Sequence, residues 1–320
     1  MGMESLGDLL KQMPGGGSAL RQADKLMEEL LADPLVGKLR SKYPELDNET
    51  IRLNLNKIYQ CTKEFRVCSN CPGLDQCPND FEGHYTELSC ETVGGQVQLN
   101  DRKVTCKKLI ARQSENKIRS RIRSFYVDDR ALLEGYSADE IVSKDIERMK
   151  AVGQIIKYIN VTKDSGLQKE GLYLTGSFGT GKTFLMCYML HELAKAGFTG
   201  AIVYMPEFVE DLKSLMLEQG KLKETVDLMK ETDLLIFDDI GAENLNPWVR
   251  DHVLGAILNY RMNRKPTFYT SNYGLDAIEQ HFSFTNKDGD ELHKGQRLMD
   301  RIRPYVQPVH VTGHNKRGLR

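Results

Sequence analysis

One short stretch constrains the fold and the chemistry of this chain more than any other. Residues 176–183 read GSFGTGKT and match the phosphate-binding pattern G-x-x-x-x-G-K-[ST] at every fixed position. The glycines allow a tight loop that brings backbone N–H groups against a polyphosphate. Lys182 is expected to reach the β- and γ-phosphates, and the Thr183 hydroxyl to hold Mg²⁺. The motif therefore predicts a nucleoside triphosphate site at Gly176, Ser177, Phe178, Gly179, Thr180, Gly181, Lys182 and Thr183.

The flanks of this loop agree with that prediction. Residues 171–175, GLYLT, form a short apolar run typical of a buried strand. Residues 184–196 carry apolar side chains at helical spacing. A strand–loop–helix unit places the phosphates at a helix N-terminus, where the helix dipole favours anions. This context disfavours the alternative, a glycine-rich turn that binds nothing.

The second half of the chain has the pattern of an α/β fold. From about residue 124, helices alternate with short apolar strands, which is the signature of a parallel sheet covered on both faces. Further strands are expected at 201–204, 234–237, 267–270 and 309–311. Helices are expected at 206–216 and 249–262.

Two carboxylates follow the most apolar of these strands. The run 234–237, LLIF, ends in Asp238 and Asp239, at the sheet edge where ligands bind in such folds. We expect Asp238 to hold Mg²⁺ and Asp239 to orient the attacking water. The alternative is a strand that simply ends in two capping aspartates, and the upstream phosphate loop makes that reading the weaker one.

Two further features complete the predicted site. Asn272 ends the next strand and is expected to sense the γ-phosphate or position water, although Asn is also a common turn residue. Arg297 and Arg301 lie four residues apart, on one helix face. Either arginine would act as an arginine finger on a neighbouring subunit's nucleotide, and surface salt bridges are the alternative.

Length and composition limit the class of protein. The 320 residues suggest about two domains, and no apolar run approaches a membrane-spanning length. The N-terminus lacks the basic start and apolar core of a signal peptide, so a cytoplasmic location and no membrane partner are expected. In a reducing compartment, a cluster of cysteines points to metal rather than disulfides.

The cysteines predict a zinc site. Five of the seven lie between residues 61 and 90, with Cys106 just beyond. A structural Zn²⁺ site is expected at Cys68, Cys71, Cys77 and His84, with Cys61 or Cys90 as alternatives to His84. Such a site would stabilise a segment too small to fold on its apolar core alone. The alternative is a group of free cysteines.

The domain boundaries follow from these patterns. Residues 1–106 combine short helices with the cysteine-rich segment, and residues 136–320 hold the nucleotide site. Between them, residues 107–135 are expected to be a linker that begins with a basic run. A solvated face is the favoured reading of that run, and contact with single-stranded DNA the lesser one.

The order of the motifs resembles the AAA+ ATPases. More narrowly, it is similar to the bacterial helicase loaders of the DnaC/DnaI type, over essentially the whole chain. The strings that carry the resemblance are GSFGTGKT, LLIFDDIGAE, PTFYTSN and GQRLMDRIRP. The cysteine-rich segment that precedes these strings narrows the resemblance to the DnaI type.

The resemblance implies a fold and roles for individual residues. The fold is an AAA+ P-loop NTPase core, a parallel sheet flanked by helices, preceded by a small helical zinc-binding domain. Asp239 stands where many relatives have Glu, which implies slow, switch-like ATP hydrolysis. The implied roles are Walker A for Lys182 and Thr183, Walker B for Asp238, sensor 1 for Asn272, arginine finger for Arg301 or Arg297, and sensor 2 for Arg317.

The implied function is that of an ATP-dependent loader. It would deliver the hexameric replicative DNA helicase onto single-stranded DNA during initiation and restart of replication, with other primosome proteins as partners. The N-terminal module would dock the helicase, and the AAA+ domain would self-associate and bind ATP·Mg²⁺. Three alternatives stay open: an ATPase that remodels a transposase, an adaptor with a degenerate ATPase site, and a zinc-dependent DNA-binding regulator.

Overall fold

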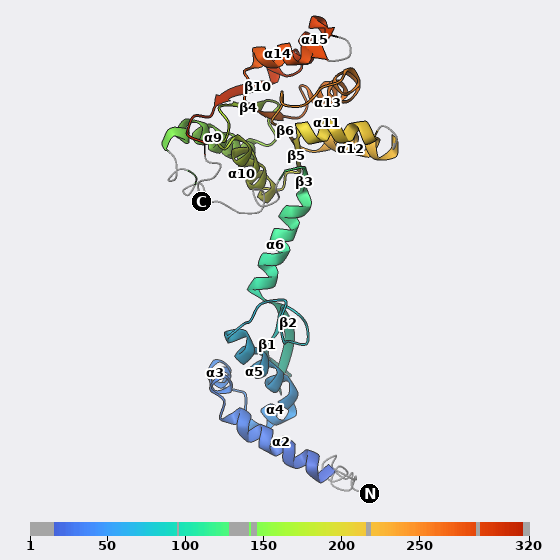
Figure 1. Cartoon of the computed structure of the whole chain (residues 1–320). Coiled ribbons are helices and arrows are strands. Elements are labelled where there is room, and N and C mark those ends of the chain that lie inside the picture. The colour runs from blue at the N-terminus through green and yellow to red at the C-terminus, as the bar shows by residue number, and fades with distance from the viewer. Residues whose placement is uncertain are drawn as a thin grey trace. The chain divides into compact units, whose positions relative to one another are not determined.

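The computed structural model describes residues 16–94, 96–127, 141, 146–215, 219–285 and 289–315. The chain divides into two compact units, Met1–Ser114 and Glu115–Arg320. Figure 1 labels the elements of both units. Among the described residues, no helix has both the length and the apolar character needed to cross a membrane.

The first unit combines short helices with a long β-hairpin. Its helices are α2 (Gly16–Leu31), α3 (Pro34–Lys42), α4 (Asn48–Leu53) and α5 (Leu55–Ser69). Strand β1 (His84–Val93) pairs antiparallel with β2 (Gln96–Thr105). Asp47 caps α4 by accepting a hydrogen bond from the Thr50 N–H at 2.7 Å. The small domain that the resemblance implies to be helical therefore also contains a hairpin of two ten-residue strands, which the sequence did not predict.

A small apolar core holds the helices against the hairpin. Its buried members come from α2 to α5 and from both strands: Leu30, Val36, Leu46, Ile51, Ile58, Leu88 and Leu99. A buried carboxylate adds polar contacts, because Glu64 on α5 accepts hydrogen bonds from the Thr86 N–H and from the Lys103 ammonium. The hairpin is thus fixed to α5 by both packing and charge.

The second unit is built on a six-stranded parallel sheet in the order β10-β4-β7-β6-β5-β3. The strands are β3 (Ile122–Phe125), β4 (Gly171–Thr175), β5 (Gly200–Tyr204), β6 (Leu234–Asp238), β7 (Thr267–Ser271) and β10 (Val306–His310). The strands predicted from residue 171 onward all form, within three residues of the expected bounds. The predicted parallel sheet is confirmed.

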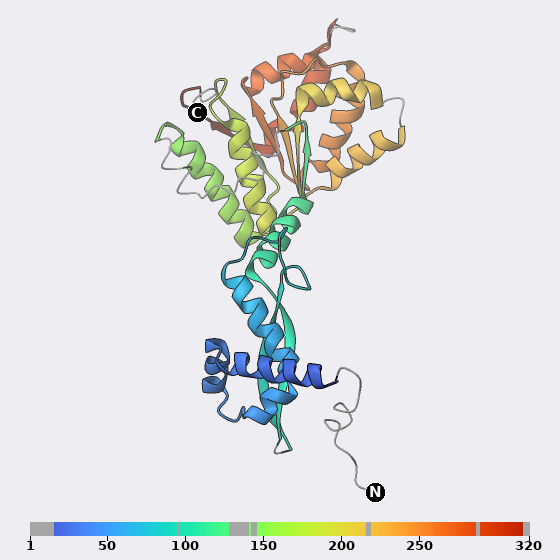
Figure 2. The same cartoon turned by 60° about the horizontal axis from the view of Figure 1, so that its bottom comes forward.

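Helices cover both faces of this sheet. On one face, α9 (Met149–Ser165) and α10 (Lys182–Lys195) pack on Leu172, Ile236 and Phe268. On the other, α11 (Met205–Leu215), α12 (Gln219–Glu231) and α13 (Gly255–Arg261) enclose a second apolar core that includes Phe237. Figure 2 shows α9 and α10 on one side of the sheet and the other helices opposite. The remaining elements are η1 (Ile146–Arg148), the π-helical η2 (Val249–Leu254), α14 (Leu275–Ser283), β8 (Phe284–Thr285), β9 (Gly289–Asp290), α15 (Leu292–Met299) and η3 (Arg303–Tyr305).

The segment expected to be a linker contains regular structure. Residues 107–121 form helix α6 (Lys107–Arg121), which has no buried residue and contains the division between the two units. Residues 122–125 form β3, the edge strand of the sheet, which pairs with β5. The apolar side chains of Ile122 and Phe125 pack against the two cores of the second unit, and this explains why so short a strand forms.

Candidate nucleotide-binding site

Three neighbouring strands bring the predicted site together. Strand β7 lies between β4, which leads into the phosphate loop, and β6, which ends in Asp238. Because the strands are parallel, their carboxyl ends meet at one edge of the sheet. Asn272 directly follows β7 and therefore sits between the loop and the carboxylates.

The phosphate loop has the conformation that its glycines permit. Gly181 adopts a left-handed conformation with φ of 90° and is the N-cap of α10. A side chain there would be strained and would also meet the Arg148 guanidinium at 2.4 Å. The loop therefore ends at the N-terminus of α10, where free N–H groups and the helix dipole attract anions.

Lys182 is buried at the centre of the loop. Its ammonium donates hydrogen bonds to the Gly176 and Ser177 carbonyls at 2.9 and 3.0 Å and to Asn272 Oδ1 at 2.8 Å. Only 8% of the residue is exposed. The positive charge is thus held in place inside the loop, where a phosphate oxygen can compete for it.

Asp238 and Thr183, which the sequence predicts as Mg²⁺ ligands, are hydrogen-bonded to each other. The Thr183 hydroxyl donates to the Asp238 carboxylate at 2.9 Å, and Thr270 Oγ1 donates to the same carboxylate at 2.7 Å. Burial raises the pKa of the Asp238 carboxyl above its usual value, and the nearby Asp239 charge adds to the rise. A hydroxyl and a carboxylate oxygen side by side suit Mg²⁺, which commonly binds one or two carboxylates together with phosphate oxygens.

Asp239 lies in an unusual backbone conformation beside the sensor residue. Its φ of 56° is left-handed, and its N–H donates to Thr270 Oγ1 at 2.9 Å. Asn272 Nδ2 donates to Asp239 Oδ1 at 3.2 Å. Asn272 therefore connects the Lys182 ammonium to the Asp239 carboxylate.

A cavity of about 690 Å³ collects these side chains. Its lining comprises Tyr126, Val127, Phe178, Gly179, Gly181, Lys182, Thr183, Phe184, Tyr204, Asp238, Asp239, Thr270 and Asn272. Sequence reasoning missed Thr270, although it stands beside Asn272 in the motif TSN. It also missed Arg148, 6% exposed, which donates to the Thr180 carbonyl at 3.3 Å and had no motif to reveal it.

The predicted arginine fingers are not part of this cavity. Arg297 and Arg301 line a different hollow of about 470 Å³, together with Arg250, Asn259 and Lys294. Arg301 donates to the Arg297 carbonyl and, at 3.4 Å, to Asn259 Oδ1. Among the described residues, the two cavities share no lining residue. Arg317 lies outside the described residues.

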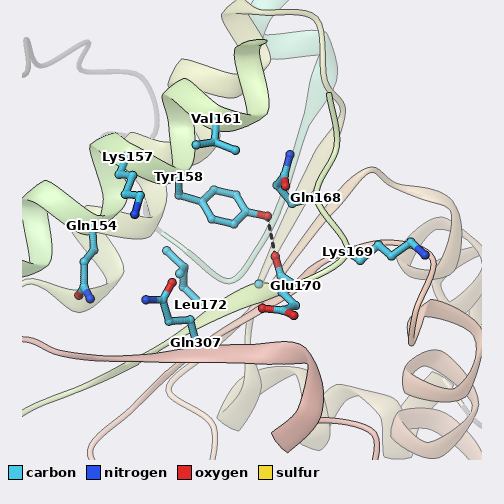
Figure 3. A pocket seen from close by; sticks show the side chains of 10 residues that line it. Gln154, Lys157, Tyr158, Val161, Gln168, Lys169, Glu170, Leu172 and Gln307 are labelled. Atoms are coloured by element: carbon cyan, nitrogen blue, oxygen red, sulfur yellow. Dashed lines mark hydrogen bonds between the residues drawn. The ribbon is translucent and has the colours of Figure 1, made fainter. Parts of the chain in front are cut away.

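A further cavity of about 550 Å³ lies at the other end of β4. Figure 3 shows Tyr158 and Leu172 at its centre, with Gln154, Lys157 and Gln307 on one side and Glu170 on the other. The Tyr158 hydroxyl donates to the Glu170 carbonyl at 2.8 Å. This cavity has neither a glycine loop nor a pair of carboxylates, so it lacks the groups that bind a triphosphate and Mg²⁺.

The cysteines of the first unit fall into two environments. Cys61 and Cys90 pack against the apolar core, and burial raises the pKa of both thiols, which disfavours the thiolate that binds zinc. By contrast, Cys68 and Cys77 accept hydrogen bonds at 3.4 Å from Asn79 Nδ2 and the Gly83 N–H. The two alternatives to His84 therefore lie in a more apolar environment than Cys68 and Cys77.

Cys106 lies beside this second group, which sequence reasoning did not expect. Its N–H donates to the Gly83 carbonyl at 2.7 Å, and its Sγ accepts from the Leu109 N–H at 3.4 Å. The pKa of Cys71 is lowered by a hydrogen bond from the Gly73 backbone and by Lys108. No group of three or more His, Cys, Asp or Glu side chains in the described part of the chain is arranged to hold a metal ion.

Comparisons with known proteins cover both units. Residues 3–98 match the family "Primosomal protein DnaI N-terminus", and residues 146–318 match the family "IstB-like ATP binding protein". The Replicative helicase loader DnaI of Bacillus subtilis is 31% identical over 98% of this chain and 99% of its own length.

Two other relatives cover part of the chain. A crystal structure of DnaI superposes with a TM-score of 0.50 at 33% identity, covering 62% of this chain and 99% of that one. A putative ATP-binding protein of insertion sequence IS1162 from Pseudomonas fluorescens is 30% identical over 32% of this chain and 44% of its own length. With both units matched and the ATP site assembled, the chain belongs to the DnaI-type helicase loaders, whose second unit is an ATP-binding domain of the IstB-like family.

Proposed function

We propose that this chain is an ATP-dependent loader that delivers a hexameric replicative DNA helicase onto single-stranded DNA during initiation and restart of replication. The observation that carries the proposal is the similarity to a replicative helicase loader over 98% of the chain, with both units included. The assembled ATP site supplies the chemistry, since Lys182, Asp238, Asp239 and Asn272 line one cavity.

Each residue of that site has a role in the proposed cycle. Lys182 would bind the β- and γ-phosphates, and Thr183 with Asp238 would hold a Mg²⁺ that neutralises developing phosphate charge. Asp239 orients the attacking water, while Asn272 shifts its hydrogen bonds between Lys182 and Asp239 when the γ-phosphate arrives. Because the Asp side chain is one methylene shorter than Glu, water is held less well, and hydrolysis is slow and switch-like.

The site is completed by a second subunit in this proposal. Arg297 and Arg301 line a cavity of their own, which leaves them available to a neighbour's nucleotide. An arginine supplied in this way stabilises charge on the transferring phosphoryl group, with an effect of about 10³–10⁵ on kcat. ATP-dependent self-association through the second unit follows, and Arg301→Ala or Arg297→Ala should reduce ATP turnover without weakening ATP binding.

The first unit is proposed to dock the helicase and to hold a structural Zn²⁺. Cys68 and Cys77 accept hydrogen bonds from Asn79 Nδ2 and the Gly83 N–H, and a hydrogen bond from the Gly73 backbone lowers the pKa of Cys71. His84 fits as fourth ligand, because its Nδ1 lies 2.9 Å from the Glu82 carbonyl, a contact that leaves Nε2 free to bind metal. Cys106 is the other candidate, since it is bonded to the same hairpin base.

Metal analysis of purified protein tests the zinc proposal. We expect one zinc per chain, lost in the Cys68→Ser, Cys71→Ser double variant. Cys61→Ser and Cys90→Ser are matched controls that should keep it, because these thiols pack in the apolar core. Comparing His84→Ala with Cys106→Ser identifies the fourth ligand by the larger loss of affinity. A folded wild-type protein without zinc would refute the proposal.

Contact with single-stranded DNA is proposed for basic side chains outside the ATP site. Helix α6 has no buried residue and carries Arg119 and Arg121 in its last turn. Lys221 and Lys223 lie exposed on α12, whereas the side chain of Lys213, a third candidate, lies outside the described residues. If these residues contact phosphates, charge removal should weaken DNA binding and reduce its salt dependence.

The second candidate function is an ATPase that remodels a transposase or another DNA-bound complex. The insertion-sequence relative supports it, but that match covers only 32% of this chain. Residues 3–98 match the N-terminal family of primosomal DnaI instead, which favours the loader.

A pull-down against a replicative helicase separates these functions. The full chain and its Lys182→Ala variant should both capture the helicase, because docking resides in the first unit. If neither captures it and a transposase is captured instead, the second candidate replaces the first.

A further inference from the structure

The turn after β6 contains a buried carboxylate that does not line the nucleotide cavity. The Glu243 side chain is completely enclosed, with 0% exposure. Its Oε2 accepts a hydrogen bond from the Gly241 N–H at 2.7 Å, and its Oε1 lies 2.9 Å from His281 Nε2. A carboxylate buried this deeply is strongly unfavourable unless such partners are present. Glu243 therefore connects the turn to helix α14, which carries His281.

This turn has a backbone that needs external support. Asp239 and Gly241 both have positive φ, 56° and 93°. Two further hydrogen bonds attach the turn to β7, from the Ile240 N–H to the Thr270 carbonyl at 2.9 Å and from Ser271 Oγ to the Ile240 carbonyl at 2.6 Å. A non-glycine residue stays in the left-handed region only where its surroundings impose it. Glu243 supports the Gly241 side of the turn by accepting the Gly241 N–H.

Close packing continues from the turn to the helix of the proposed arginine fingers. A methyl group added at Gly241 would lie 2.6 Å from Ile278 Cδ1, so the turn touches α14 directly. A methyl group added at Gly295 of α15 would lie 2.0 Å from Ser283 Oγ and 2.7 Å from the Glu279 carbonyl, both on α14. With no free space at either contact, movement of the turn must displace α14 and α15 together.

We propose that Glu243 and His281 form a positioning pair for ATP hydrolysis. The pair holds Asp239 in its left-handed conformation toward the nucleotide. It also transmits a change at this site through α14 to α15, which carries Arg297 and Arg301. The inference rests on the proposed function, in which Asp239 orients water and one of these arginines serves a neighbour. The nucleotide state of one subunit thereby sets the position of the finger that it offers to the next.

Replacing Glu243 separates positioning from binding. Glu243→Ala leaves the Gly241 N–H without its acceptor, whereas Glu243→Gln keeps an acceptor oxygen and can still bond His281. In the full chain, we expect Glu243→Ala to lower kcat by about tenfold to a hundredfold, with ATP affinity unchanged within about threefold. Glu243→Gln should recover most of that loss. The Glu243→Ala, His281→Ala double variant should be no worse than the single, because the two act as a unit.

A matched control is a carboxylate that pairs two helices elsewhere in the same unit. Glu192 joins α9 and α10 through Lys163 at 3.0 Å and Lys195 at 2.7 Å. Glu192→Gln should leave kcat and ATP affinity at wild-type values. Wild-type kcat in folded Glu243→Ala, or equal losses of kcat and ATP affinity, would overturn the inference.

Hydrogen–deuterium exchange tests the coupling without relying on hydrolysis. In the wild type, ATP·Mg²⁺ should slow exchange in the loop 176–183, in the turn 239–243 and in both α14 and α15. In Glu243→Ala, protection should be confined to the loop. Equal protection of α15 in both proteins would refute the coupling. Absence of Lys182-dependent hydrolysis in the wild type would instead count against the proposed function, while the exchange data still decide the coupling.

Discussion

Asp238 shows at the residue scale how a binding site reduces the stability of the empty protein. Its carboxyl is 3% exposed and shares its surroundings with Asp239, so burial and like charge raise its pKa. The folded chain therefore binds the Asp238 proton more tightly than the unfolded chain does. Stability is highest with this group protonated and falls as pH rises above the usual aspartate value of 3.8.

Asp238→Asn should consequently raise the melting temperature of the nucleotide-free protein at pH 7. The amide keeps an acceptor for Thr183 and Thr270 but removes the buried charge. The gain should shrink toward pH 4, where the wild-type group becomes protonated. With ATP·Mg²⁺ present the order should reverse, since only the wild type gains the stabilisation of bound metal. Thermal melts with and without ligand measure both effects, and a variant less stable at pH 7 without ligand would contradict this account.

Thr270 connects the Asp238 carboxylate to the Asp239 backbone and gives a second prediction at this scale. Its hydroxyl donates to Asp238 Oδ1 and accepts from the Asp239 N–H. Thr270→Val preserves shape but removes both bonds in a buried site, which should lower the free energy of unfolding by about 1–3 kcal/mol. ATP turnover should also fall. Thr270→Ser keeps the hydroxyl and is the control for denaturant melts and ATPase assays; equal behaviour of the two variants would show that the hydroxyl is dispensable.

Single residues also show what the sequence can and cannot reveal. Lys182, Thr183, Asp238 and Asn272 were predictable, because each belongs to a motif whose chemistry requires that residue type at that position. Glu243 and Arg148 were not, because their roles depend on tertiary neighbours far along the chain, such as His281 and Thr180. The sequence shows that Cys106 is a cysteine, but it does not predict that Cys106 lies at the base of the hairpin.

At the scale of elements, prediction succeeded where a strand is buried on both faces and failed in the first unit. The strands β4, β6 and β7 are continuous apolar runs, which periodicity detects. The sequence did not predict the hairpin β1–β2, because polar side chains dominate both strands and the cysteines of this segment indicate metal binding instead. Its signal was the Gly94-Gly95 pair between two runs rich in Val and Thr, a common hairpin turn.

Arg261 links helix α13 to the end of α12 and to the segment before β7. The residue is fully buried at the end of α13. It donates to the carbonyls of Met229 in α12, of Thr232 just after α12 and of Pro266 just before β7. Arg261→Met would leave these carbonyls without a donor, so the free energy of unfolding should fall by about 3–5 kcal/mol.

A nearby arginine provides the control. Arg264 is exposed, and its guanidinium lies over the Tyr260 ring, 5.2 Å from the ring centroid. Arg264→Met should change the free energy of unfolding by less than about 1 kcal/mol in the same denaturant titration. Similar losses of unfolding free energy in the two variants would mean that the Arg261 hydrogen bonds do not stabilise the contact between α12 and β7.

At the scale of the whole molecule, the two units contribute differently to the candidate site. All the described residues that line the ATP cavity belong to the second unit, Glu115–Arg320. Residues 115–320 alone should therefore bind ATP·Mg²⁺ with an affinity within about twofold of the full chain, because no contact from the first unit is lost. Calorimetric titration checks this, and a tenfold weaker fragment would show that the first unit contributes to the site.

The most direct test of the central claim is deposition of a replicative helicase on circular single-stranded DNA. The number of helicase hexamers retained on the DNA is measured with wild-type chain or the Lys182→Ala variant, each with and without ATP. We predict ATP-dependent deposition by the wild type and none by the variant, although both bind the helicase. Equal deposition by the two proteins, or none by the wild type, would contradict the claim that this ATP site controls loading.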